Sequence, residues 1–120
     1  MGYFFDSYAI IECIGDNKSY DKFQDEIMIT TILNLVEVYY SILRRFDHNI
    51  AESTIKRLNV QIIEIDLNIA LEAAKFRHEN YKRSLSYIDC IWYLIARKNN
   101  LRFLTGDKQF ENKEDVEFVK

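Results

Sequence analysis

Residues 3–14 read YFFDSYAIIECI, in which a short aromatic run passes directly into a segment with helical spacing. Tyr8, Ile11 and Ile14 fall on one face of a helix. The stretch therefore predicts a strand over residues 3–5 that leads into a helix over residues 8–14.

The same alternation continues along the rest of the chain. The further predicted helices cover residues 18–25, 32–45, 49–58, 67–82 and 87–98, and the further predicted strands cover residues 27–29, 60–65, 101–104 and 116–119. Strands that alternate with helices pack best as a mainly parallel sheet with helices on both faces. The predicted fold class is therefore α/β.

Length and composition narrow the class of protein. The chain has 120 residues, of which 48% are hydrophobic and 29% charged, so we expect residues 1–120 to form a single domain. A formal net charge of −3 provides no global basic field, so a role on nucleic acid has to be argued locally. Cys13 and Cys90 have no CxxC partner, and no apolar run is long enough to span a membrane. These features predict a soluble cytoplasmic protein with two core thiols.

Four acidic residues stand in apolar surroundings at predicted strand ends or in early helical turns: Asp6, Glu37, Asp89 and Asp107. In a parallel α/β sheet, binding sites form beyond the carboxyl ends of the strands. Carboxylates crowded there repel one another unless divalent cations lie between them. Ligand sets made only of oxygen suit Mg²⁺ or Mn²⁺. The pattern predicts a metal site that activates water for attack on a phosphodiester.

Each of these acids also has a purely structural interpretation. Asp6 is well placed to cap the helix that follows it, and Asp107 suits a turn. Glu37 is alternatively a solvated residue at the edge of its helix. Asp89 lies among apolar neighbours, where an unpaired charge is costly, so it must be capped, paired or bound to a metal.

Taken together, four short motifs resemble those of PIN-domain ribonucleases, especially the VapC-like toxins of prokaryotic toxin–antitoxin pairs. The motifs are Asp6-Ser7 after the first strand, Thr31 with Asn34 and Glu37, Asp89 within SYIDC (residues 86–90), and Thr105-Gly106-Asp107. They occur in the expected order and span essentially the whole chain.

The resemblance implies a three-layer α/β/α fold and RNA cleavage that depends on Mg²⁺ or Mn²⁺. It also implies an antitoxin that blocks the site, and commonly a homodimer. By position, the catalytic and metal-binding residues are Asp6, Glu37, Asp89 and Asp107, with Thr31 and Thr105 as supporting hydroxyls. Residues 108–112 lack the further Asp that some relatives have, so the resemblance leaves open whether one or two ions bind.

Basic residues near two of these motifs are candidates for contact with the RNA backbone. Lys82 and Arg83 precede the segment that carries Asp89, and Lys108 follows Asp107. Paired basic residues are alternatively solvated helix ends.

Two other functions stay open at this point. A receiver-like phospho-signalling domain has this length and sheet, but the chain lacks the paired acids that such domains carry after the first strand. The other alternative is a PIN-like module that binds RNA or protein without catalysis.

Overall fold

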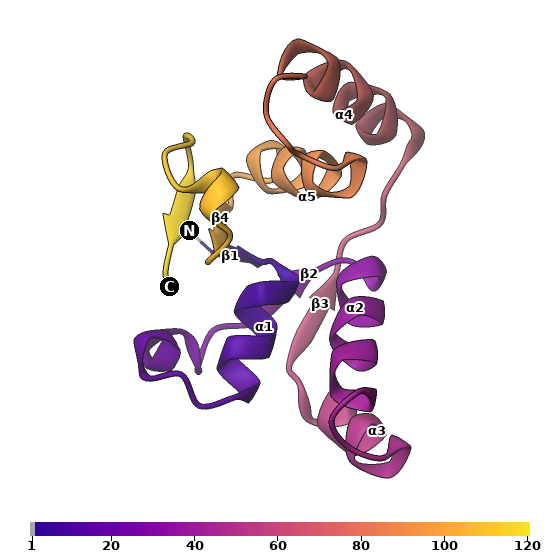
Figure 1. The fold of residues 1–120 in the computed structure, drawn as a ribbon, viewed down its shortest axis with the longest axis vertical. Coiled ribbons are helices and arrows are strands. Elements are labelled where there is room, and N and C mark those ends of the chain that lie inside the picture. The colour runs from indigo at the N-terminus through magenta and orange to yellow at the C-terminus, as the bar shows by residue number, and fades with distance from the viewer. Residues whose placement is uncertain (1) are drawn as a thin grey trace.

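In the computed structural model, which describes residues 2–120, five short strands form one sheet in which every pairing is parallel. The strands are β1 (Tyr3–Phe5), β2 (Met28–Thr30), β3 (Val60–Ile62), β4 (Arg102–Thr105) and β5 (Val116–Phe118). Their order across the sheet is β3-β2-β1-β4-β5 (Figure 1). The prediction of a mainly parallel sheet is confirmed.

Helices cover both faces of this sheet (Figure 1). They are α1 (Ser7–Ile14), α2 (Ile32–Leu43), α3 (His48–Arg57), α4 (Leu67–Glu79) and α5 (Tyr87–Lys98), with short 3-10 helices η1 (Lys18–Phe23) and η2 (Lys108–Phe110). Alternate strand residues serve two cores: Phe4 and Phe103 pack with α4 and α5, whereas Phe5 and Leu104 pack with α1, α2 and α3. The three-layer α/β/α arrangement is therefore confirmed.

Three elements differ from the predictions in type or by three residues, whereas the other boundaries lie within two residues of those predicted. The predicted helix over 18–25 is a 3-10 helix that begins after an Asn17 cap. The third strand ends at Ile62 because its only neighbour, β2, ends at the Thr30 paired with it. Helix α4 stops at Glu79, where the C-cap residue Asn80 leaves helical geometry and its side-chain amide donates to the carbonyl of Phe76 at 2.9 Å.

The strand order creates a switch point between β1 and β4. From β1 the chain adds β2 and β3 on one side and then returns to place β4 and β5 on the other. Connections leave a switch point in opposite directions, which opens a crevice at the carboxyl ends of the strands. Asp6 directly follows β1 and Gly106-Asp107 directly follow β4, so both segments lie at this edge.

None of the helices formed within residues 2–120 is long and apolar enough to cross a membrane.

Candidate active site

A cavity of about 470 Å³ opens at this edge of the sheet, and all four predicted acidic residues line it: Asp6, Glu37, Asp89 and Asp107. They come from different segments, namely the start of α1, the middle of α2, the first turn of α5 and the turn after β4. The structure therefore brings together four carboxylates that lie far apart in the sequence.

Asp6 and Asp107 are joined through the hydroxyl group of Thr105. This hydroxyl donates to Asp6 Oδ2 at 2.7 Å and accepts from the backbone N–H of Asp107 at 3.0 Å. The Thr105 side chain is fully buried, and Asp6 is only 7% exposed. The other Asp6 oxygen, Oδ1, accepts from the backbone N–H of Ser7 at 2.8 Å. Thr105 thus fixes the first and the last of the four acids against each other.

Burial raises the pKa of the Asp6 carboxyl to about 7. Hydrogen bonds from Thr105 and from the backbone of Ser7 oppose this rise, because they stabilise the ionised form. The negative charges of Asp89 and Glu37 raise the pKa of Asp6 further. The ionised form of this carboxyl is therefore disfavoured in the metal-free cavity.

Asp89 is held by a capping box at the start of α5. Its Oδ2 accepts from the backbone N–H of Ser86 at 3.0 Å, and its own N–H donates to Ser86 Oγ at 3.0 Å. Asp107 in turn caps η2, because its Oδ1 accepts from the N–H of Gln109 at 3.0 Å. The structural roles considered for these two acids are therefore real, yet each cap occupies a single carboxylate oxygen.

A buried polar chain made of Trp92, Thr31, Asn34 and Ser7 lies behind the cavity. Trp92 Nε1 donates to Thr31 Oγ1 at 3.1 Å, and Thr31 Oγ1 donates to Asn34 Oδ1 at 2.7 Å. Asn34 Nδ2 then donates to Ser7 Oγ at 3.0 Å. All four residues are buried. The buried polar chain connects α5, the start of α2 and α1, the helices that carry Asp89, Glu37 and Asp6.

The donor set of this cavity fits a hard divalent cation. Its acidic ligands supply only oxygen, as Mg²⁺ and Mn²⁺ prefer, and a cation would compensate the ionised form of Asp6. Within residues 2–120, no three His, Cys, Asp or Glu side chains converge closely enough to form a compact metal cluster. Mg²⁺ usually binds through one or two carboxylates and keeps several waters, for which the cavity has room.

The predicted basic residues divide into two groups. Lys108 lines the cavity, whereas Lys82 and Arg83 are exposed in the connection between α4 and α5 and do not line it. Lys120, Tyr8 and Trp92 also line the cavity, and the sequence analysis did not identify them. For Trp92 a signal was available, because it follows Asp89 by three residues and so shares its helix face.

Comparisons with known proteins agree with this architecture. The family model described as "PIN domain" matches residues 3–116. VapC20 of Mycobacterium tuberculosis, described as a Sarcin-Ricin loop cleaving toxin, has a TM-score of 0.78 at 15% identity over 99% of this chain and 100% of that chain. A toxin-antitoxin complex from Klebsiella pneumoniae gives a TM-score of 0.77 at 18% identity over 97% of this chain and 96% of that chain.

A third solved structure, VapBC2 from Rickettsia felis bound to a DNA fragment from its promoter, gives a TM-score of 0.75 at 15% identity over 100% of both chains. At these identities the structural likeness concerns the fold. The comparison with curated proteins finds no match.

Proposed function

Because the chain belongs to the PIN domain family, we propose that it is a Mg²⁺- or Mn²⁺-dependent endoribonuclease and the toxin of a toxin–antitoxin pair. The observation that supports this proposal is that four carboxylates far apart in the sequence line one cavity at the switch point of the sheet. The same family match favours a nuclease over a receiver-like signalling domain.

In this proposal Asp6, Glu37, Asp89 and Asp107 hold one or two metal ions. When bound, the metal supplies charge neutralisation for a phosphodiester and lowers the pKa of water. Thr105 keeps Asp6 aligned with Asp107, and the buried polar chain keeps α2 and α5 in position. Each capped acid retains one oxygen beyond its cap for this task, Oδ1 in Asp89 and Oδ2 in Asp107.

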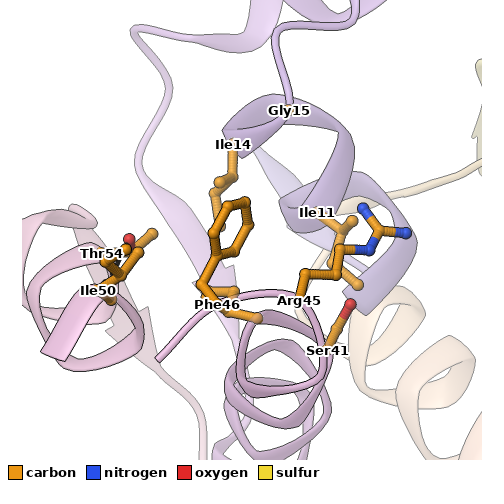
Figure 2. A pocket seen from close by; sticks show the side chains of 9 residues that line it. Ile11, Ile14, Gly15, Ser41, Arg45, Phe46, Ile50 and Thr54 are labelled. Carbon is orange, nitrogen blue, oxygen red and sulfur yellow. Dashed lines mark hydrogen bonds between the residues drawn. The ribbon is translucent and has the colours of Figure 1, made fainter. Parts of the chain in front are cut away.

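An antitoxin partner is part of the same proposal, and a second cavity suits it. This cavity of about 300 Å³ lies between α1, α2 and α3 and includes Ile14, Arg45, Phe46 and Ile50 in its lining. Figure 2 shows Phe46, Ile14 and Arg45 among the side chains that line it. An amphipathic segment with an apolar anchor and an acidic residue for Arg45 matches this surface.

A second copy of the chain is the proposed occupant of another apolar surface. Ile32, Val36 and Tyr40 are spaced four residues apart on α2 and are exposed by 59%, 58% and 63%. They line an open groove of about 440 Å³ together with Ile55 of α3. A shallow apolar surface of this kind suits a two-fold contact in which the same patch serves both copies. We place this homodimer in the cytoplasm, where RNA is available and buried thiols such as Cys13 stay reduced.

The nuclease proposal is tested with Asp6→Asn and Asp89→Asn. Each change removes a charged ligand, so Mg²⁺-dependent cleavage of single-stranded RNA should fall by at least about a hundredfold, the scale of losing one electrostatic group from a catalytic site. Trp92 is the chain's single tryptophan and lines the cavity, so quenching of its fluorescence by Mn²⁺ measures metal binding separately. The matched control is Asp21→Asn, at an exposed acid on η1.

Undiminished cleavage by both variants would remove the proposed mechanism. Quenching by Mn²⁺ without any RNA cleavage by the wild-type protein would instead favour a PIN-like module that binds without catalysis. Thermal unfolding of each variant establishes that it is folded before its activity is compared.

A further inference from the structure

The lining of the acidic cavity includes an aromatic ring and a lysine that the proposed metal chemistry does not use. Tyr8 lies in the first turn of α1, two residues after Asp6, and Lys120 follows β5. Both side chains line the cavity, and Lys120 Nζ lies 5.7 Å from the centre of the Tyr8 ring. Helix α1 and the segment after β5 therefore contribute one aromatic and one cationic group to the lining of the same cavity.

We propose that Tyr8 and Lys120 form a nucleotide subsite beside the acidic cavity. In this subsite the Tyr8 ring stacks on one base of single-stranded RNA, and the Lys120 ammonium binds a phosphate of the same strand. The proposal rests on the proposed ribonuclease function and extends it, because it assigns residues that hold the substrate next to the cleaved bond.

The Tyr8 ring has a fixed position, which a stacking surface needs. The ring occupies the space left by the missing side chain of Gly106: a Cβ atom there would lie only 2.6 Å from Tyr8 Cζ and 2.7 Å from the Val119 carbonyl oxygen. The aromatic side chain also packs against the core shared by α1, α2 and α3. Because the ring is already ordered, a stacked base loses little free energy to immobilising it.

Other aromatic residues near the site are less suitable for stacking. Trp92 lines the cavity but is only 3% exposed, and its N–H is bound to Thr31. Tyr87 is exposed at the start of α5, but it is not part of the cavity wall. Tyr8 is half-buried, so one part anchors the ring and the rest meets the cavity.

Charge is a second argument for the subsite. Four carboxylates line the cavity and repel phosphate, so the phosphates of a bound strand need positive groups nearby. Lys108 and Lys120 provide them, and within residues 2–120 neither lysine forms an ion pair with an acidic side chain. Proteins that bind single-stranded nucleic acid without sequence preference usually combine stacking on an aromatic ring with nearby cationic side chains.

The test measures binding of two labelled oligomers of equal length by fluorescence anisotropy, with Ca²⁺ in place of Mg²⁺ and a gel to verify that they stay intact. One is a single-stranded oligoribonucleotide, and the other is an abasic ribose-phosphate chain that has phosphates but no bases. Tyr8→Leu should weaken binding of the oligoribonucleotide by about tenfold, because one stacked base is lost. Its binding of the abasic chain should be unchanged. Tyr8→Phe should bind both like the wild-type protein.

Lys120→Ala should weaken binding of both oligomers. It should also reduce the slope of the logarithm of the binding constant against the logarithm of salt concentration by about one, the value for one phosphate contact. Its matched control is Lys56→Ala, at an exposed lysine on α3, which does not line the cavity. Tyr8→Met provides a second apolar replacement if Tyr8→Leu unfolds. Quenching of Trp92 by Mn²⁺ should be unchanged in all these variants, because none alters a carboxylate.

The subsite is refuted if Tyr8→Leu binds the oligoribonucleotide as tightly as the wild-type protein, or loses affinity for both oligomers equally. It is also refuted if Lys120→Ala binds both oligomers like Lys56→Ala. Each of these outcomes leaves the nuclease proposal intact as long as the wild-type protein cleaves RNA. Failure of the wild-type protein to bind or cleave RNA overturns both proposals.

Discussion

Asp6 is the residue whose environment has the clearest thermodynamic consequence. Its pKa of about 7 exceeds the ordinary value near 4 that it has in the unfolded chain. Between about pH 4 and pH 7 the folded protein therefore holds a proton that the unfolded chain has lost. The stability that Asp6 contributes is fully present below about pH 4 and is lost as the pH rises through 7.

This behaviour predicts that the metal-free wild-type protein unfolds more easily at pH 8 than at pH 5. Asp6→Asn, which carries no ionisable group, should remove most of that difference and raise the free energy of unfolding at pH 8 by on the order of 2 kcal/mol. Urea denaturation in EDTA at the two pH values measures both effects. An Asp6→Asn protein with the same pH dependence as the wild type would show that another group is responsible.

Among the elements, α1, α2 and α5 depend on the buried polar chain for their relative placement. Asn34 is its central member, because it accepts from both the N–H and the hydroxyl of Thr31 and donates to Ser7. Replacing it with an apolar residue of similar size leaves buried donors without partners. Unpaired groups of this kind are expensive away from water.

Asn34→Leu should therefore lower the free energy of unfolding by about 2 to 4 kcal/mol, since two or more buried polar groups lose their partners. Asn68→Leu, at an exposed position of α4, is the matched control and should change stability by less than about 0.5 kcal/mol. Chemical denaturation at neutral pH compares them. Equal effects of the two substitutions would contradict a structural role for the buried polar chain.

The sequence was informative wherever a feature depended on neighbours along the chain. The periodic apolar pattern predicted most strands and helices, and the aromatic run before Asp6 and the apolar setting of Asp89 were local signals for two of the acids that line the cavity. Whether those acids bind metal stays a prediction. Contacts across the fold were not accessible in this way: Trp92 meets Thr31 from 61 positions away, and Lys120 reaches Tyr8 only because β5 pairs with β4.

At the scale of the whole molecule, helix α2 presents two separate apolar surfaces for the two proposed partners. Val36→Asp places a charge in the groove assigned to a second copy, and Phe46→Asp places one in the cavity assigned to the antitoxin. Both residues are more than half exposed, so neither change should unfold the protein.

Val36→Asp should be a monomer when its mass is measured by light scattering after size-exclusion chromatography. It should still bind the proposed antitoxin, which we expect the adjacent reading frame to encode. Phe46→Asp should remain a dimer and bind that product at least about tenfold more weakly, as expected for loss of an aromatic anchor. A Val36→Asp protein with the mass of the wild type would rule out the groove as the homodimer contact. Unchanged binding by Phe46→Asp would rule out the proposed antitoxin cavity.

The hydrogen bond from Thr105 to Asp6 joins positions 99 residues apart, and β1 gains its neighbour β4 only when the last segment is present. During translation, Asp6 therefore emerges from the ribosome long before the residues that complete its surroundings. A nascent polypeptide lacking residues 102–120 has Asp6 but neither the Thr105 hydroxyl that binds it nor the Asp107 carboxylate of the same cavity. Under the proposed activity, chains that lack residues 102–120 should therefore not cleave RNA, because Asp107 and the two lysines that line the cavity are missing from them.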